Sequence, residues 1–256
     1  MRLASRILTI GTLAAVLGAC GRTEEAAKET TVEMPEPEPV NMLTAEEVAE
    51  GWQLLFDGTS TDAWRGYGRE DFLSDSWSVE DGALMVVGTS GDMLGTDIIT
   101  KESFKDFELS LEFKVSPSGN SGIFYRVLEE DGMEIWQNAA EYQILDDDAY
   151  VAEGTRAEDA HLTAGNYDLH PSTGATVKPV GEWNLAGILV QGNHVEHWLN
   201  GVKVVEYELS SEDWAKRVAA SKFVEYPGFS KTETAPIGLQ DHGRNVWFRN
   251  IKIRRL

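Results

Sequence analysis

The chain has 256 residues but a single cysteine, Cys20, so no disulfide can form within it. Basic residues are also scarce: 22 lysines and arginines stand against 43 aspartates and glutamates, and the formal net charge is −21. A chain this acidic is repelled by nucleic-acid phosphates and by anionic lipid head groups. We therefore expect no nucleic-acid partner.

Several catalytic motifs are absent as well. The sequence has no GxSxG, no HExxH, no glycine-rich phosphate loop and no CxxC. Serine-triad, zinc-peptidase, nucleotide and redox-thiol chemistries therefore have no support. The residues left for chemistry are carboxylates, histidines, amides and aromatic rings.

A long apolar run occurs only near the N-terminus. A basic start precedes apolar residues 7–17, a run too short to span a bilayer as a helix. The next residues, LGAC, resemble a bacterial lipobox, in which Cys20 is lipidated and becomes the mature N-terminus. We expect residues 1–19 to be a signal peptide and the lipid to be the sole membrane anchor.

Residues 20–43 read as the lipidated Cys20 followed by a disordered tether. The segment is acidic, contains prolines and has almost no aromatic side chains, so it cannot bury enough surface to fold. Gly21 also lacks the acidic character that retains lipoproteins at the inner membrane in enterobacteria. We expect a protein lipid-anchored in the bacterial cell envelope, at the outer membrane and facing the periplasm or the cell surface.

Residues 44–256 are predicted to form one all-β domain. TAEE (44–47) has the pattern of a capping box that opens a short helix, and residues 104–116 alternate like a half-buried antiparallel strand. Asn200-Gly201 marks a β-hairpin. Many strands at short spacing, with one or two short helices, indicate a two-sheet antiparallel sandwich. The turn-rich stretch 148–182 is predicted to be a long loop over one sheet.

Two predicted strands carry polar side chains where a sheet would place core residues. GNSGIFYR (119–126) contains Arg126, and EYQILDD (141–147) contains Glu141 and Gln143. Because strand side chains alternate between faces, Glu141 and Gln143 share one face. Such groups are costly to bury unless they bind a ligand or one another. The pattern therefore predicts a polar binding site.

Each of these residues also has a structural alternative. Glu141 can be a general base or a metal ligand, or it can form a salt bridge with Arg126, which alternation places on the face of Phe124. Gln143 can bond a sugar hydroxyl or remain a solvated amide. The acidic run 146–148 suits calcium, although a charge run after a strand is more often solvated.

Histidine and tryptophan supply the other candidates. His242 precedes a glycine at a predicted strand end, where it can act as an acid or base or simply bond the backbone of a turn. Trp183 and Trp198 can stack on a sugar ring, although core packing is the commoner role of tryptophan. His197 alternates with apolar residues and is predicted to pack within the sheet.

Several segments of the chain form a recognisable ordered set. They are GWQLLFDGTSTDAWRG (51–66), GNSGIFYR, EYQILDD, GNYDLHP (165–171), PVGEWN (179–184), VEHWLNG (195–201), PIGLQDHG (236–243) and VWFRNIKIRRL (246–256). Together they resemble the bacterial 3-keto-disaccharide hydrolase family over roughly the whole predicted domain. The resemblance implies a concanavalin A-like jelly roll related to laminin-G-like folds, often carried on a lipoprotein anchor.

The resemblance also implies an activity on glycosides that are already oxidised to a ketone at sugar C3. The ketone acidifies the C2 proton, a base removes it, the C1 substituent leaves from the enolate, and water can then add. On this basis Glu141 or His242 is the base, the other assists the leaving group, and Arg126 or a divalent cation stabilises the enolate. The residues that would position hydroxyls are Asn120, Gln143, Asp146, Trp183, Asn184 and Gln240.

The sequence establishes no cofactor, and a divalent cation held by Glu141 and Asp146 stays an open alternative. The leading expectation is a lipid-anchored hydrolase or lyase with a small carbohydrate substrate. A non-catalytic, lectin-like lipoprotein and a conventional β-glucanase are the alternatives. A retaining glycosidase needs two closely spaced carboxylates, and Glu141 with the Asp146 cluster is the one such group evident.

Overall fold

The computed structural model describes residues 40–88, 96–154, 160–174 and 176–256. The predicted signal peptide, Cys20 and nearly all of the predicted tether lie outside the described residues. Within the described part, no helix is both long and apolar enough to cross a membrane.

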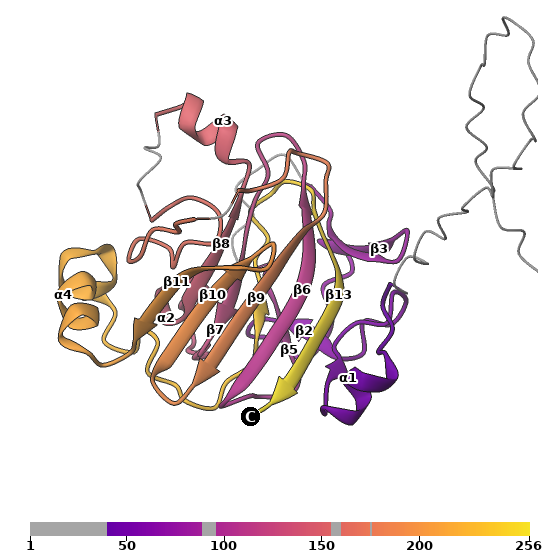
Figure 1. Ribbon diagram of the computed structural model, residues 1–256, viewed down its shortest axis with the longest axis horizontal. Helices are drawn as coiled ribbons and strands as arrows, with labels where there is room; N and C mark the ends of the chain where they lie inside the picture. Colours follow the sequence, from indigo (N-terminus) through magenta and orange to yellow (C-terminus); the bar gives the residue numbers. More distant parts are fainter. Residues whose placement is uncertain (1–39, 89–95, 155–159, 175) are drawn as a thin grey trace, which may run out of the picture. The chain divides into compact units, whose positions relative to one another are not determined.

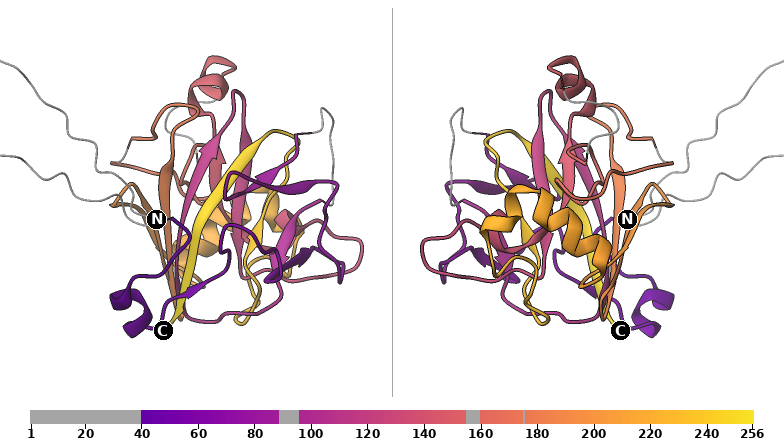
Figure 2. Two further views of the ribbon diagram at one scale, coloured as in Figure 1. Left: turned by 90° about the vertical axis from the view of Figure 1, so that its right-hand side faces the viewer. Right: turned by 90° about the vertical axis from the view of Figure 1, so that its left-hand side faces the viewer.

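Two antiparallel sheets pack face to face, which confirms the predicted all-β sandwich (Figure 1 and Figure 2). Among the described residues, the larger sheet has the spatial order β11–β10–β9–β6–β13–β4–β3, and β1 also pairs with β13. Its strands are β1 (Gln53–Leu54), β3 (Trp77–Glu80), β4 (Ala83–Val86), β6 (Phe107–Val115), β9 (Asn184–Gln191), β10 (His194–Leu199), β11 (Val202–Glu208) and β13 (Val246–Arg255).

The smaller sheet has the order β2–β5–β12–β7–β8. Its strands are β2 (Trp64–Gly66), β5 (Ile98–Thr100), β7 (Asn120–Tyr125), β8 (Ala140–Leu145) and β12 (Gly238–Leu239). Apart from β7 and β8, which follow one another in the chain, neighbours in this sheet come from distant parts of the sequence, so long-range pairing holds most of it together.

The helices are short and lie around the sheets. They are α1 (Ala45–Ala49), α2 (Ile135–Asn138), α3 (Asp147–Ala152), α4 (Glu212–Ala220) and the 3-10 turn η1 (Lys222–Glu225). The predicted capping box is present, because the Thr44 hydroxyl accepts a bond from the Glu47 N–H and the Glu47 carboxylate accepts one from the Thr44 N–H. Ser211 caps α4, whereas α2 and α3 are additions that the sequence pattern does not predict.

Local sequence explains the hairpins of the larger sheet. Asp81 and Gly82 join β3 to β4 with φ of 48° and 75°, and Asn200 and Gly201 join β10 to β11 with φ of 50° and 82°. Two consecutive positive φ values are the geometry of the tight turn that suits the twist of a hairpin. Side chains of β6 alternate regularly between the core and the outer face, as predicted.

The strands β7 and β8 of the smaller sheet are buried on both faces, and the carboxyl and amide side chains among them lie on the face that points away from the larger sheet. Ile123 and Tyr125 of β7, with Tyr142 and Ile144 of β8, point into the core between the sheets. The opposite face carries Phe124, Glu141 and Gln143, and α2 packs against it through Ile135. A polar face that is covered rather than solvated needs a function or a set of partners.

The stretch after α3 covers the edge of β8. The N–H of Gln143 donates to the carbonyl of Gly165, the N–H of Ala164 donates to the carbonyl of Gln143, and the N–H of Tyr167 donates to the carbonyl of Glu141. Residues 164–167 therefore pack along the edge of the smaller sheet, whereas the start of the predicted loop of residues 148–182 is helical in α3. These contacts hold the backbone of β8 from the side opposite β7.

Candidate active site

A cavity of about 220 Å³ opens on the outer face of the smaller sheet. We call it the Glu141 cavity. Its lining residues are Asp97, Asn120, Glu134, Trp136, Glu141, Gln143, Tyr167, Lys222, Gln240, Asp241 and His242. The volume lies below the ~300 Å³ of drug-sized ligand pockets and suits one small ring rather than an extended chain.

Glu141 lies at the bottom of this cavity. Only 5 % of its surface is exposed, and on the diagonal of the β-ladder it faces Gly122, which has no side chain. Burial is the main reason why the pKa of the Glu141 carboxyl is raised to about 8; the charge of Lys222 lowers this pKa and the charge of Asp97 raises it. Because its pKa is raised, this carboxylate is a stronger base than an ordinary glutamate once it has lost its proton.

Lys222 supplies a positive charge to the Glu141 cavity. Its ammonium lies 4.3 Å from the ring centre of Trp136 and 4.4 Å from that of Tyr167, so two aromatic faces hold it by cation–π contact. Desolvation lowers its pKa, and the charge of Glu141 raises it. The arrangement keeps an ammonium group near Glu141 without a direct ion pair, which leaves it available to a substrate oxygen.

Asp97 is a second buried carboxyl in the same cavity. It directly precedes β5, and its Oδ1 accepts a hydrogen bond of 2.8 Å from the backbone N–H of Asp241. Burial raises its pKa to about 8, and the negative charges of Asp241 and Glu134 act in the same direction. Asp97 is therefore protonated at neutral pH.

Two amide oxygens in the wall of the cavity lack a partner among the described residues. They are Oδ1 of Asn120 and Oε1 of Gln240, both buried. The Asn120 amide nitrogen donates to the hydroxyl of Tyr150, which fixes its orientation. Buried acceptors without donors are costly, so these oxygens are suited to bind ligand hydroxyl groups.

His242 lies exposed at the mouth of the cavity, on the turn that follows β12. The turn is held by the carboxylate of Asp241, whose Oδ1 accepts a 2.8 Å bond from the N–H of Gly243. Asn120, Glu141, Gln143, Gln240 and His242 are thus brought together as the sequence predicts.

The structure does not bring Arg126 to Glu141, and this corrects the expectation that alternation places it on the face of Phe124. β7 ends at Tyr125, and Arg126 has a φ of +57°, which breaks the alternation. Its guanidinium donates to the carbonyl of Gly192 and lines a different cavity. Lys222 is the cation that lies in the Glu141 cavity.

Three other predicted residues also lie outside the cavity. Asp146 caps α3, since its carboxylate accepts bonds from the N–H groups of Ser118 and Ala149, so it does not join Glu141 as a ligand pair. Trp183 packs under Lys114 and Arg249 on the outer face of the larger sheet.

Asn184 is buried at the start of β9. Its Oδ1 accepts from the N–H of Lys178 and from the amide of Asn200, so it braces the loop before the strand and the turn of the next hairpin. His197, as predicted, is packed in the core, bonded to Tyr125 and to the carbonyl of Ala164.

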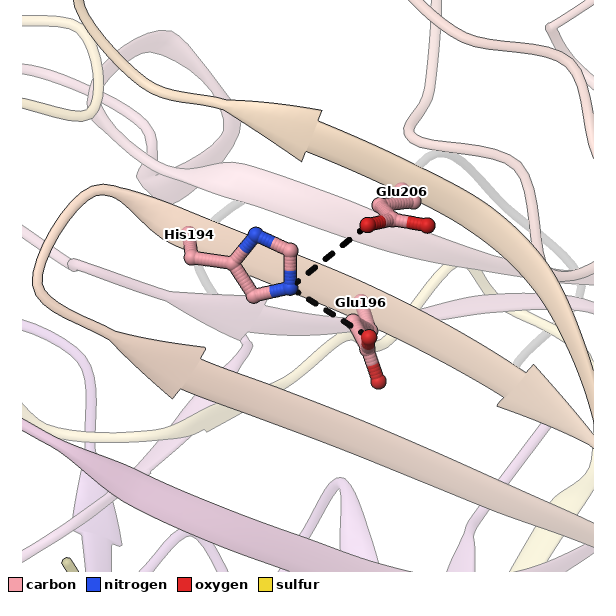
Figure 3. A group of neighbouring side chains, drawn as sticks. All are labelled: His194, Glu196 and Glu206. Atoms are coloured by element: carbon pink, nitrogen blue, oxygen red, sulfur yellow. Dashed lines mark hydrogen bonds and ion pairs between the residues drawn. The ribbon is translucent and has the colours of Figure 1, made fainter.

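A group with metal-ligand chemistry lies elsewhere among the described residues. Figure 3 shows His194 and Glu196 of β10 converging with Glu206 of β11; the imidazole Nε2 is 3.3 Å from Glu196 and 3.9 Å from Glu206. The ammonium of Lys203 lies 3.0 Å from Glu196 and 2.5 Å from Glu206. A lysine therefore already fills the position that a metal ion would take, on the face of the sandwich away from the Glu141 cavity.

The chain is similar to known proteins along most of its length. Residues 51–254 match the family described as the 3-keto-alpha-glucoside-1,2-lyase-like domain. The chain belongs to this family. A 3-keto-disaccharide hydrolase of Bacteroides thetaiotaomicron is 38 % identical in an alignment of 231 residues that covers 81 % of this chain and 79 % of that protein. The predicted family is thereby confirmed, and with it a glycoside-cleaving enzyme.

Two solved structures are similar to this chain over most of its length. A structure described as a glycosyl hydrolase from Parabacteroides distasonis has a TM-score of 0.78 and 35 % identity, covering 85 % of this chain and all of that one. A second glycosyl hydrolase structure from the same organism has a TM-score of 0.59 and 27 % identity, covering 80 % of this chain and 99 % of that one.

Three lining residues of the Glu141 cavity, Asp97, Trp136 and Lys222, were not predicted from the sequence. Asp97 offered only a weak signal, a carboxyl directly before the short apolar strand of residues 98–100. Lys222 and Trp136 lie in η1 and α2, where no periodic pattern distinguishes a cavity residue from a surface one. Their roles follow only from packing between distant segments.

Proposed function

We propose that this protein cleaves 3-keto-glycosides by removing the C2 proton and releasing the C1 substituent, as a hydrolase or a lyase. The observation that carries the proposal is the buried Glu141 carboxyl, with its pKa raised to about 8, in one cavity with the caged ammonium of Lys222. A base and a cation that are both desolvated are suited to form an enolate next to a ketone.

In the first step Glu141 takes the proton from C2. The electron pair of the broken C–H bond moves toward the C3 ketone, whose oxygen gains negative charge. Lys222 stabilises that oxygen electrostatically, and the low polarity of the aromatic cage strengthens the effect. In this proposal Lys222 takes the role that was expected of Arg126 or of a divalent cation.

In the second step the C1–O1 bond breaks and O1 receives a proton. Asp97 suits this role because it is buried, protonated at neutral pH and has Asp241 and Glu134 rather than a cation as charged neighbours. Glu141 has Lys222 nearby, which favours loss of its proton. The two carboxyls are therefore assigned as base and acid by their surroundings.

A lyase would release the product with a C1–C2 double bond at this point. For net hydrolysis, water adds to C1, giving a proton to Asp97, while Glu141 returns its proton to C2. Both carboxyls then regain their starting states. The free oxygens of Asn120 and Gln240 would accept bonds from substrate hydroxyls, and His242 at the mouth would contact the departing group.

The test compares 3-keto-trehalose and p-nitrophenyl 3-keto-glucoside with their unoxidised forms, with and without a chelator. We expect release of the C1 substituent from the keto forms alone. Asp97→Asn should slow the disaccharide strongly and the nitrophenyl substrate little, because nitrophenolate leaves without a proton. Equal cleavage of the unoxidised sugars would indicate a conventional glycosidase, and binding without turnover would indicate a lectin.

We further propose that the enzyme acts outside the cytoplasm as a lipoprotein anchored through Cys20. The LGAC segment and the acidic, proline-containing tether support this. Metabolic labelling with an alkyne fatty acid should tag the wild type but not Cys20→Ala. Equal labelling of both would contradict the anchor.

A further inference from the structure

A second cavity lies between α4 and the end of the smaller sheet. Its volume is about 470 Å³, roughly twice that of the Glu141 cavity. Arg126 lines it, and we call it the Arg126 cavity. Neither the family assignment nor the proposed reaction gives it a role.

The charge of Arg126 is buried without an ion-pair partner among the described residues, although from a greater distance it adds to the lowering of the pKa of Glu233 by Lys105. Only 6 % of the residue is exposed, its single hydrogen bond is the one to the carbonyl of Gly192, and its Nε is a buried donor with no acceptor among the described residues. Within the described part of the chain no carboxylate lies within ion-pair distance of it. Glu233 on the cavity wall pairs instead with Lys105 at 2.9 Å. A buried guanidinium in this state favours an anion.

The remaining walls combine one more free polar group with an apolar surface. The hydroxyl of Ser230 is buried and has no partner among the described residues. Trp214 and Phe229 stack with ring centres 5.9 Å apart and planes 10° apart, and Leu209 adds an aliphatic side. Lys231 also lines the cavity and adds a second positive charge. Glu233 is the one acidic residue among its lining side chains.

We propose that the Arg126 cavity binds a small organic carboxylate with an aromatic or aliphatic body. The carboxylate bonds the free N–H of Arg126 and the hydroxyl of Ser230, and the body packs against Trp214, Phe229 and Leu209. Neither a bare inorganic anion nor a neutral sugar satisfies both the guanidinium and the apolar wall. This inference is independent of the reaction proposed for the Glu141 cavity.

The experiment measures binding of phenylacetate to the whole protein by calorimetry, with phenylacetamide, phosphate and chloride as comparisons. We expect phenylacetate to bind at least about tenfold more tightly than the amide, which has the same shape without the charge. Arg126→Met should abolish binding and Ser230→Ala should weaken it. Arg69→Met, an exposed arginine outside the cavity, controls for the change in net charge.

Three results would overturn the proposal. The first is the absence of binding heat with phenylacetate at about 10 mM, a concentration that detects even weak binding. The second is equal affinity for phenylacetate and phenylacetamide. The third is an affinity for phenylacetate that is unchanged in Arg126→Met. If phosphate binds as tightly as phenylacetate, the claim that the apolar wall contributes to ligand binding would be overturned. If Arg126→Met does not fold by circular dichroism, Ser230→Ala and Trp214→Leu decide, together with the acid–amide comparison on the wild type.

Discussion

Gly122 of β7 leaves the space that the carboxyl group of Glu141 occupies. A Cβ atom at position 122 would lie 2.2 Å from Oε1 of Glu141 and 2.7 Å from its Cγ. Both distances are shorter than van der Waals contact allows, so any side chain at 122 must displace the Glu141 side chain. The carbonyl of Gly122 also accepts the N–H of Gln240, which links this position to a second wall of the cavity.

Gly122→Ala is therefore predicted to impair catalysis by moving Glu141. We expect kcat on a 3-keto-glucoside to fall about 100-fold, the scale of loss that a misplacement of about 1 Å produces. The melting temperature should fall only moderately, because the end of the Glu141 side chain can move.

A double-mutant cycle separates this effect from general damage. If Gly122→Ala acts through Glu141, then adding it to Glu141→Gln should cost almost nothing further in kcat. Additive losses would show that Gly122 matters for another reason.

The pH dependence of kcat/KM should be bell-shaped with an optimum near pH 8. Glu141 must lose its proton to act as base, so activity rises on the acid side; Asp97 must keep its proton to act as acid, so activity falls on the alkaline side. Because the two carboxyls interact, the apparent pKa values belong to the pair.

Asp97→Asn should remove the alkaline limb of this profile. The alkaline fall should disappear with an activated leaving group, while the acid limb should stay close to its position, because Asp97 is already neutral in the active form and asparagine is neutral as well. Asp62→Asn, an exposed aspartate outside the cavity, is the matched control, and blanks without enzyme correct for loss of the keto sugar. A profile unchanged by Asp97→Asn would remove Asp97 from the reaction.

The polar face of β8 could be predicted because its backbone is regular. β7 holds it on one side and residues 164–167 on the other, so the pleat is kept and alternation places Glu141 and Gln143 correctly. At Arg126 the same rule fails, because a left-handed backbone follows the last residue of β7. No local pattern in the sequence marks that position as left-handed.

The rest of the site depends on contacts between distant segments. Trp136, Tyr167 and Lys222 come from α2, the loop after α3 and η1, and they meet only through packing. The family motif placed Trp183 and Asn184 in the site, yet Trp183 directly precedes β9 and Asn184 begins it, and β9 belongs to the larger sheet. A motif therefore identified the family more reliably than it identified the role of each residue.

Lys222→Met is predicted to lower kcat and to shift the acid limb of the pH profile to higher pH. The charge of Lys222 lowers the pKa of Glu141, so its loss makes the base harder to ionise, and it also removes stabilisation of the enolate. We expect kcat/KM at pH 7 to fall about 100-fold.

Lys216→Met is the matched control, because Lys216 is a strongly exposed lysine of α4 that makes a surface ion pair of 3.9 Å with Glu212. It should leave both kcat/KM and the pH profile unchanged. An acid limb that stays in place in Lys222→Met would exclude Lys222 as the charge that acts on Glu141.

Glu141→Gln is predicted to stabilise the fold at alkaline pH while it abolishes turnover. Folding raises the pKa of Glu141 from 4.5 to about 8, so its contribution to stability is fully present below pH 4.5 and is lost as the pH rises through 8. Each pKa unit corresponds to about 1.4 kcal/mol, and a neutral glutamine avoids this loss.

Relative to the wild type, the melting temperature of Glu141→Gln should therefore change little near pH 4.5 and rise by at least about 3 °C near pH 9, the shift that about 1 kcal/mol produces in a domain of this size. Differential scanning calorimetry at the two pH values measures it. Glu153→Gln, at the exposed end of α3, controls for the loss of one surface carboxylate and should give the same small shift at both. A stabilisation by Glu141→Gln that does not grow with pH would mean that the carboxyl ionises normally in the folded protein, and Glu141 would then lack the basicity that proton abstraction requires.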